Sequence, residues 1–421
     1  MTVFDWSDPA TRGAALARPS GRDDPALREA VAGIVNDVRD RGWDALAEQA
    51  LRIDGRAPSR IAVAPYAEQA RRSLPEEAQD AMKLAARNIE AFHRETRPRD
   101  VEVTTAPGLT VAKQWRPLDR AGLYVPGGKA PLFSTLLMLA IPARVAEVGE
   151  LVVVTPPRPD GVLDPAIALA AELAGIEAIW TVGGAQAIAA LAFGAGDIPA
   201  VDRICGPGNA WVAAAKSLVA SLPGGPGIDL PAGPSELLVI ADDSADPVTV
   251  AADMLSQAEH DVEAQVLLVS PSAAIIEAVA GEVERQSAAM GGNLAPARFI
   301  RCADLDEAIA IANAYAPEHL SLACDGAAEM VRAIRNAGAI FVGHSAAESF
   351  GDYLAGSSHV LPTDGAARFT GGVSTLTFMK AITVQQVSRE AAAALAAPAA
   401  ALARLEGLEA HARAAEARVP A

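Results

Sequence analysis

The chain has 421 residues, which is enough for two or more domains of roughly 150 residues each. It carries 52 acidic against 35 basic side chains, a net charge of −17, and only 4% aromatic residues, which argues against nucleic acid or an anionic membrane surface as a partner. The three cysteines form no CxxC pair and the apolar runs are shorter than about 20 residues, so we expect a cytoplasmic protein without a membrane span.

The first hundred residues are predicted to be mostly helical. Residues 1–24 are polar, lack the features of a signal peptide and are expected to form an irregular N-terminal arm. Asp24 followed by proline is a typical helix start, and apolar residues at helical spacing then continue to Gly42. Further helices are expected over 43–51 and 66–95.

The middle of the chain alternates strands with helices. Residues 101–116 alternate polar and apolar side chains around a Pro-Gly turn, which predicts a β-hairpin. Short apolar strands then alternate with alanine-rich helices over 122–227, a rhythm typical of a parallel sheet covered on both faces. Strands are expected within 122–128, 151–155, 178–182 and 203–205, and helices at 164–174, 184–193 and 209–221.

A second series of strands and helices begins at residue 236. Strands are expected at 236–241, 265–270, 298–302 and 339–342, and helices at 246–259, 272–288, 305–315 and 326–337. Loops rich in Gly, Pro and Ser cluster at 343–375, and a helical tail interrupted at Pro398 follows over 388–418. The predicted fold class is α/β. The predicted domains are the arm 1–24, a discontinuous α/β domain formed by 25–121 and 236–375, a second α/β domain at 122–235, and a helical tail at 376–421.

Candidate metal ligands occur at the end of the helix expected at 246–259. Gln257 and His260 are three residues apart, so on a helix they would share a face and could form half of a metal site. A histidine taken alone is more often an ordinary polar residue, and His93, on a charged helical stretch, is expected at the surface. Since no HExxH or CxxC spacing is present, any metal would need ligands from distant segments, and zinc suits imidazole with carboxylate.

A second group of candidate residues is Glu318 with His319. Pro317 disfavours a helical conformation for the residue before it, so a turn can project both side chains. A carboxylate beside an imidazole can transfer protons, although a helix end with routine polar residues explains the pattern equally well. Glycine-rich loops at strand-to-helix junctions allow a dinucleotide, but none matches GxGxxG followed by an acidic residue about 20 positions later.

Six segments resemble, in order, the signature segments of the histidinol dehydrogenase family. They are GLYVPGG at 122–128, GPGN at 206–209, IDLPAGPSE at 228–236, SQAEHD at 256–261, APEHL at 316–320 and GDYLAGSSHVLPT at 351–363. Each segment alone is weakly specific, whereas the ordered combination is highly specific. The resemblance extends from about residue 25 to the C-terminus.

This resemblance implies that the chain oxidises L-histidinol to L-histidine in two NAD-dependent steps. It also implies two incomplete Rossmann-like domains, one Zn2+ ion per subunit, and a homodimer with intertwined tails. The matching zinc ligands are Gln257, His260, Asp352 and His411, the last from the partner subunit. The matching acid/base pair is Glu318 and His319. Substrate contacts are implied at the ligands and at Ser235, His319, His359 and Glu406, and NAD contacts at Tyr124, Gln186 and Asn209.

Three departures from the family pattern leave alternatives open. Trp211 replaces the usual tyrosine after GPGN, Ser357 and Ser358 replace Pro-Asn before His359, and residues 221–227 are slightly extended. Because of the altered segment before His359, a related zinc- and NAD-dependent dehydrogenase of another polar alcohol is a second hypothesis. A non-enzymatic zinc-binding protein ranks last, because structural zinc usually prefers cysteine and no cysteine lies in a proposed ligand segment.

Overall fold

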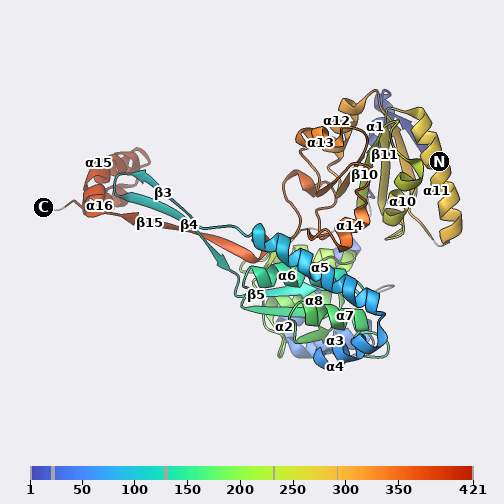
Figure 1. Cartoon of the computed structure of the whole chain (residues 1–421). Coiled ribbons are helices and arrows are strands. Elements are labelled where there is room, and N and C mark those ends of the chain that lie inside the picture. Colours follow the sequence, from blue (N-terminus) through green and yellow to red (C-terminus); the bar gives the residue numbers. More distant parts are fainter. Residues whose placement is uncertain (1, 20–23, 128–130, 231–232, 292, 420–421) are drawn as a thin grey trace.

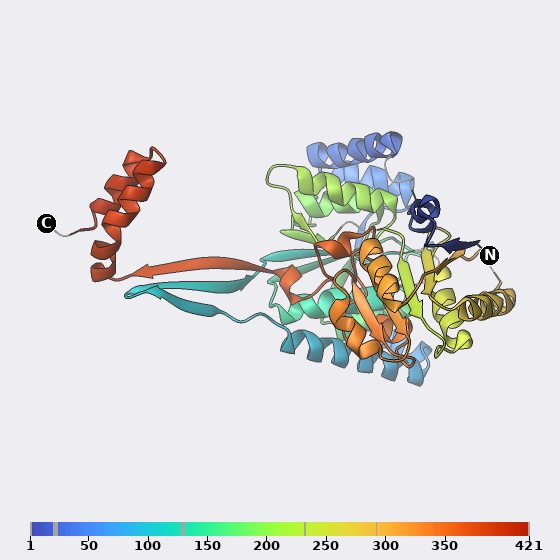
Figure 2. The same cartoon turned by 90° about the horizontal axis from the view of Figure 1, so that it is seen from above.

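The computed structural model describes residues 2–19, 24–127, 131–230, 233–291 and 293–419. The chain forms two α/β lobes side by side and a long module that projects away from them (Figure 1). In the view from above, the projecting module again stands apart, with the C-terminal helices far from both lobes (Figure 2). Residues 20–23 of the predicted arm, and Gly128, Pro231 and Ala232 of the signature segments, lie outside the described residues.

Lobe A is built on a six-stranded parallel sheet. Its order is β1 (Thr2–Asp5), β12 (Ala297–Arg301), β11 (Gln265–Ser270), β10 (Glu236–Ala241), β13 (His319–Ala323) and β14 (Ala339–Val342). From β10 onward, the chain order across the sheet is 3-2-1-4-5, the Rossmann order without its sixth strand. The helices of this lobe are α1 (Pro9–Ala15), α10 (Pro247–Ala258), α11 (Ala273–Met290), α12 (Leu305–Tyr315) and α13 (Ala327–Met330).

Lobe B repeats this architecture. Its sheet order is β2 (Ser59–Ala62), β7 (Ala178–Thr181), β6 (Glu150–Thr155), β5 (Arg120–Tyr124), β8 (Arg203–Cys205) and β9 (Gly227–Ile228), with β2 antiparallel at the edge. One apolar core on this sheet includes α4 (Ala64–Ser73), α5 (Glu76–Glu95), α6 (Phe133–Val145) and α7 (Pro165–Leu173). The other includes α2 (Pro25–Arg41), α3 (Trp43–Ile53), α8 (Gly184–Phe193) and α9 (Ala210–Ser221). Two incomplete Rossmann-like domains were expected and are present.

The early helices belong to lobe B, not to the domain with which they were grouped. We expected residues 25–121 to join 236–375, but α2 packs on α8 and α9, and α4 packs on α7. The stripe of Val31, Val35 and Val38 on α2 lies in the same core as the helices of lobe B. An amphipathic helix shows which of its faces is buried but not against which sheet, so the sequence pattern did not distinguish the two lobes.

Five strands were not expected from the sequence: β1, β2, β9, β13 and a strand at Met379–Val387, which lies in the tail that was predicted to be helical. Residues 2–5, predicted to be irregular, form β1 along β12 at the edge of lobe A, and α1 follows. β2 pairs with β7 in lobe B. β13 was read only as a turn with two projecting side chains, although it lies beside β10 in the interior of the sheet. Strands of four or five residues carry too little periodicity to identify alone, and their partners lie far away in the chain.

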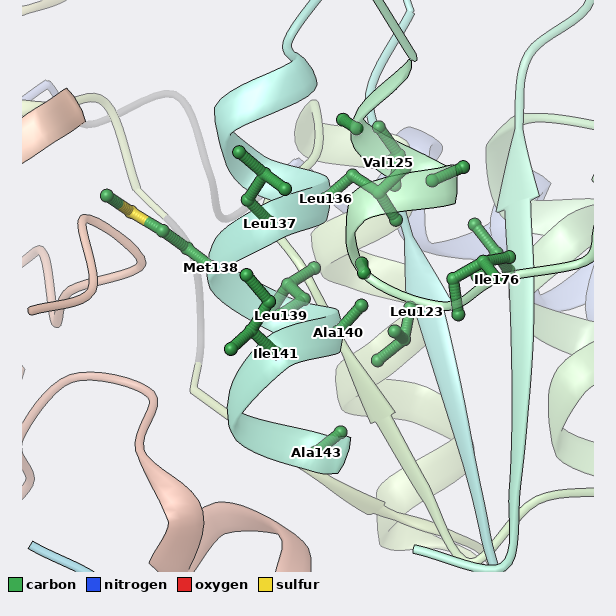
Figure 3. Close-up of a cluster of buried hydrophobic side chains, with 14 of the residues drawn as sticks. Leu123, Val125, Leu136, Leu137, Met138, Leu139, Ala140, Ile141, Ala143 and Ile176 are labelled. Carbon is green, nitrogen blue, oxygen red and sulfur yellow. The ribbon is translucent and has the colours of Figure 1, made fainter. Parts of the chain in front are cut away.

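Helix α6 lies at the centre of lobe B. Ten consecutive residues, 134–143, are buried, which explains why this segment is almost entirely apolar. Figure 3 shows Leu136 and Leu139 of α6 in the same apolar cluster as Leu123 of β5 and Val125, which follows that strand. Among the described residues, no helix has the length and apolarity needed to cross a membrane. The N-terminus of α6 faces the cavity described below, so this core sets the position of Ser134 and Thr135.

The projecting module consists of three strands and two helices. The predicted hairpin is present as β3 (Val101–Ala106) and β4 (Leu109–Pro117), and β15 (Met379–Val387) adds a third antiparallel strand. The chain then forms α15 (Arg389–Leu405) and α16 (Glu409–Glu416). Pro398 was expected to interrupt the tail but lies inside α15, and we find no contact that explains its tolerance. Leu405, 84% exposed, and Leu402 are apolar side chains without cover in the single chain.

The segment between the lobes carries short helical elements. These are α14 (Glu348–Tyr353) and 3-10 turns at Ala366–Arg368 and Thr375–Phe378, whereas the 3-10 turn at Val331–Ala333 belongs to lobe A. Val360, Val373 and Phe378 join the core of lobe B, whereas β14, just before α14, belongs to lobe A. Residues 348–359 therefore cross from one lobe to the other, and their side chains are placed between the two sheets.

His93 is buried, contrary to the prediction of a surface position. It continues the buried stripe of Met82, Ala85 and Ile89 on α5, and neither ring nitrogen has a hydrogen-bond partner among the described residues. Burial lowers the pKa of His93 to about 4. The helical spacing of the stripe indicates this burial, but the charged neighbours of His93 obscured it.

Replacing His93 with leucine should reduce the loss of stability in mild acid. Because its pKa is lowered in the folded state, stability is lost as the pH falls from about 6.5 towards about 4, by about 2 kcal/mol at pH 5. The drop in melting temperature between pH 7 and pH 5 should therefore be smaller in His93→Leu than in the wild type. His344→Leu, at an exposed histidine, should show the wild-type drop. An equal drop in His93→Leu would show that His93 does not titrate as a buried group.

Candidate active site

A cavity of about 1100 Å³ opens between the two lobes. Lobe B contributes the carboxyl edge of its sheet, where β5 and β8 end. Lobe A contributes the opposite, amino edge of its sheet, where β10 and β13 begin. The candidate site residues that line the cavity are Asn209, Ser235, His260, Glu318, His319, Asp352 and His359. The sequence distributes these residues over 150 positions, and the fold gathers them around one cavity.

A buried ion pair supports the GPGN loop on the lobe B side. Lys216, 2% exposed, pairs with Asp229 and donates a hydrogen bond to the Gly206 carbonyl at 2.9 Å. Asp229 in turn accepts from the Gly206 amide at 2.6 Å. The Oδ1 atom of Asn209 caps α9 by accepting from the amides of residues 211 and 212 at 3.1 and 3.2 Å. The start of α9 therefore faces the cavity, where a helix N-terminus favours a phosphate.

The other two expected NAD contacts do not line this cavity. Tyr124 and Gln186 are buried at the same edge of the lobe B sheet, and burial raises the pKa of Tyr124 to about 12. The Tyr124 hydroxyl accepts from the Gly184 amide at 3.3 Å. Gln186 donates to the Asp54 carboxylate, which also accepts from the Gly183 amide, both at 3.1 Å. Asp54 thus occupies the start of α8, a role that no motif in the sequence indicates.

Glu318 and His319 lie where α12 gives way to β13. Ala316 adopts a left-handed conformation, with φ 56°, which ends the helix before Pro317. The amide of Glu236 donates to Glu318 at 2.9 Å, and burial raises the pKa of Glu318 well above its usual range. His319 Nδ1 lies 3.1 Å from the Glu236 carbonyl, which can only accept, so Nδ1 carries the proton and Nε2 is left as an acceptor. Burial lowers the pKa of His319 to about 3, which keeps the ring neutral.

The expected metal ligands approach the cavity from two segments. Gln257 is fully buried at the end of α10, and both its amide atoms lack a partner among the described residues. His260 lies two residues beyond the helix end, in an exposed turn, so the expected pairing on one helical face is replaced by a helix-to-turn arrangement. Asp352, on α14, lies with Oδ1 3.9 Å from His319 Nε2, and burial raises its pKa to about 6.

These three side chains fit a metal ion, although they do not complete a site. In the described part of the chain, no group of three or more His, Cys, Asp or Glu side chains could hold a metal. Gln257, His260 and Asp352 include only two such residues, and the third is an amide. A buried amide with no partner costs free energy unless something binds it, and a metal would satisfy its oxygen. An imidazole, a carboxylate and an unsatisfied amide oxygen are donor types that suit zinc.

Two expected site residues, Glu406 and His411, lie far from the cavity of their own chain. Both are exposed on the projecting module, which stands clear of the lobes in both views (Figures 1 and 2). His359, in contrast, lies on the segment between the lobes, with Nε2 3.2 Å from the Thr135 hydroxyl. Burial lowers the pKa of His359 to about 4. Thus the single chain brings together most of the expected site but neither residue of the tail.

Glu348 is a site residue that the sequence analysis missed. It is 2% exposed, its Oε1 lies 3.4 Å from His319 Nδ1, and neither carboxylate oxygen has a hydrogen-bond partner among the described residues. Burial raises the pKa of Glu348 well above its usual range. Residues 343–375 were read as loops, whereas recognising α14 would have placed Glu348 and Asp352, four residues apart, on one face.

Comparisons with known proteins show which family the chain resembles over nearly its whole length. The sequence model of the family described as histidinol dehydrogenase matches residues 17–419. Histidinol dehydrogenase from Xanthomonas euvesicatoria is 46% identical over 424 aligned positions, covering 98% of each chain. The enzyme of that name from Idiomarina loihiensis is 44% identical, covering 95% of this chain and 92% of its own length. The crystal structure of histidinol dehydrogenase from Elizabethkingia anophelis superposes with a TM-score of 0.94, at 36% identity, over 100% of this chain and 98% of that one.

Proposed function

Because the chain belongs to the histidinol dehydrogenase family, we propose that it oxidises L-histidinol to L-histidine in two NAD-dependent steps at a zinc site. The observation that carries this proposal is the state of His319. Its imidazole is neutral, its Nδ1 proton is held by the Glu236 carbonyl, and its Nε2 is left free beside the cavity. A neutral ring with one unoccupied nitrogen can accept the proton of an alcohol.

In the first step, His319 Nε2 takes the hydroxyl proton of the alcohol as the carbon is oxidised to the aldehyde level. In the second step, the Glu318 carboxylate takes a proton from the water that adds to the aldehyde. Bound NAD would supply the acceptor for one hydride in each step, and a zinc ion held by the proposed ligands would supply a fixed positive charge that orients the substrate. Asn209 and the start of α9 would position the cofactor, with Tyr124 and Gln186 nearby at the same sheet edge.

The zinc ligands would be Gln257, His260 and Asp352 of one chain and His411 of the partner subunit. Glu406 of the partner subunit, with Ser235 and His359, would contact the substrate. Glu406 and His411 are exposed on the projecting module, where a partner subunit could receive them. Exposed Leu402 and Leu405 on the same module support a homodimer with intertwined tails, because apolar patches favour protein contacts.

The charge balance and the cysteines bear on the partners and the cellular compartment that we propose. A small polar substrate is the proposed partner, with neither nucleic acid nor a membrane, in agreement with the acidic balance of 52 to 35 charged side chains. The three cysteines are free and buried, which fits a reducing cytoplasm.

The yield of NADH per L-histidinol tests this function. The zinc-loaded protein should form two NADH and one L-histidine per substrate molecule, and a chelator should abolish turnover. One NADH per substrate would indicate a simple alcohol oxidation. Weak turnover of L-histidinol with strong turnover of another polar alcohol would favour the related dehydrogenase. That alternative is considered because Ser357 and the buried Ser358 differ from the family pattern just before His359. Bound zinc without NADH from any alcohol would indicate a binding protein.

Replacing Glu318 with glutamine should separate the two steps. The amide preserves the size of the side chain and can still accept the Glu236 amide, but it cannot take a proton from water. Oxidation of the aldehyde should therefore slow by about 100-fold or more, while the first step slows much less. Rapid-mixing measurement of the first and second NADH would resolve the steps. Equal loss in both would contradict this division of labour.

A further inference from the structure

We propose that Arg18, in the N-terminal arm, is a positioning residue that holds Glu318 and His319 in place through Glu236. This inference rests on the proposed function for its catalytic meaning, but its geometry is independent of substrate. The sequence analysis assigned no role to the N-terminal 24 residues or to Glu236.

The guanidinium of Arg18 forms a two-point contact with a buried carboxylate. Nε lies 2.6 Å from Glu236 Oε1, and Nη2 lies 2.9 Å from Oε2. Nη2 also donates to the Tyr315 carbonyl at 2.9 Å, and the guanidinium lies over the Tyr315 ring at 3.9 Å. Such planar, paired hydrogen bonds are specific to arginine and hold both side chains in one orientation.

Glu236 connects this ion pair to both proposed catalytic residues. Its backbone amide donates to Glu318 Oε2 at 2.9 Å, and its carbonyl accepts from His319 Nδ1 at 3.1 Å. Its carboxylate accepts from the Glu318 amide at 3.3 Å and from the Asp364 amide at 3.0 Å. The backbone and side chain of this one residue therefore contact 318, 319 and 364.

Removing Arg18 would leave the Glu236 carboxylate buried without its cation. A buried carboxylate that loses its partner either moves towards water or takes up a proton, and both weaken its acceptance of the Glu318 amide. Burial already raises the pKa of Glu236, and the hydrogen bond from Arg18 opposes that shift. The start of β13 would then lose part of its anchorage, and the imidazole of His319 would no longer be held in one tautomer.

This role is separable from docking of the arm on lobe A. Arg12, six residues earlier, lies over the Trp6 ring and donates to the Trp6 carbonyl at 2.8 Å. No contact of Arg12 reaches Glu236, Glu318 or His319 among the described residues. Arg12→Met is therefore a matched control that removes an arginine of the same arm without touching the site.

Histidine labelled with 15N provides a readout that does not depend on activity. In the wild type and in Arg12→Met, His319 should be in the single tautomer with the proton on Nδ1, identified by the loss of its signals in His319→Asn. In Arg18→Met, this tautomer should be partly or wholly lost. A wild-type His319 spectrum in Arg18→Met would overturn the positioning role, whatever the enzyme oxidises.

Kinetics of the same proteins give a second test. Arg18→Met should lower kcat for L-histidinol about 10-fold or more with KM changed less than about threefold, because the proposed zinc ligands Gln257, His260 and Asp352 lie on other segments. Arg12→Met should keep the wild-type kcat. Arg18→Lys keeps the charge but loses the paired hydrogen bonds of the guanidinium, so its kcat should lie between those of the wild type and Arg18→Met. This variant replaces Arg18→Met in the test if the methionine variant does not fold. A wild-type kcat in both Arg18 variants would contradict the inference, whereas an inactive wild type would contradict only the proposed function.

Discussion

The His319→Asn enzyme should turn over L-histidinol about 100- to 10,000-fold more slowly than the wild type, which is the usual contribution of a general base. Asparagine retains an N–H near the position of Nδ1, so it can still donate to the Glu236 carbonyl that the imidazole contacts at 3.1 Å. It has no counterpart of Nε2, the nitrogen that lacks a partner and lies 3.9 Å from Asp352. The substitution thus removes the proton acceptor while keeping the anchor.

Two measurements separate loss of the base from loss of the site. Zinc content and melting temperature should remain at wild-type values in His319→Asn, because none of the proposed ligands changes. His344→Asn provides the control, since His344 is a partly exposed histidine that lies outside the cavity lining and contacts Ser244 and Asp325. Turnover within about threefold of the wild type in His319→Asn would show that another group takes the proton.

The His411→Ala enzyme should lose both zinc and turnover, although His411 is exposed and far from the cavity of its own chain. Loss of a direct ligand should weaken zinc binding by more than the roughly 10- to 100-fold typical of an outer-shell partner. No contact within the single chain predicts this effect, because the module that carries His411 stands clear of both lobes (Figure 2). The effect would require the projecting module to reach the cavity of a partner subunit.

Metal analysis after dialysis against a weak chelator measures the zinc loss, and the rate of NADH formation measures the turnover. Arg413→Ala is the control, since Arg413 lies on the same helix and pairs with Glu409 on the surface. That variant should keep its zinc, because exposed pairs of this kind contribute about 1 kcal/mol or less. Wild-type zinc content in His411→Ala would exclude the tail as a source of a ligand.

The local patterns of the sequence predicted most elements and two α/β units, whereas their Rossmann-like character was implied by the family resemblance. Alternation of short apolar strands with helices was sufficient for this, because buried parallel strands and amphipathic helices differ in length and period. Spacing alone drew attention to Gln257 with His260 and to Glu318 with His319. Their roles came from resemblance, since a side chain's chemistry does not show which distant residues it will meet.

The features that were missed depend on contacts between distant parts of the chain. β13 is a strand because β10 and β14 lie on either side of it, and the arm forms β1 because β12 offers an edge. Glu236 resembles any residue at the start of a strand until Arg18 and His319 are seen to contact it. Glu348 likewise becomes notable only through its burial beside His319. Burial and contact of this kind are properties of the fold, not of local sequence.

A heterodimer of one His319→Asn chain and one His411→Ala chain tests most directly the claim that each site is shared between two subunits. In such a dimer, one site would carry both substitutions, while the other would have an intact body from the His411→Ala chain and an intact tail from the His319→Asn chain. The purified heterodimer, isolated with two different affinity tags, should therefore recover about half of the wild-type activity, whereas each homodimer is nearly inactive. If each tail served its own body, both sites of the heterodimer would be defective, and the absence of activity would contradict this account.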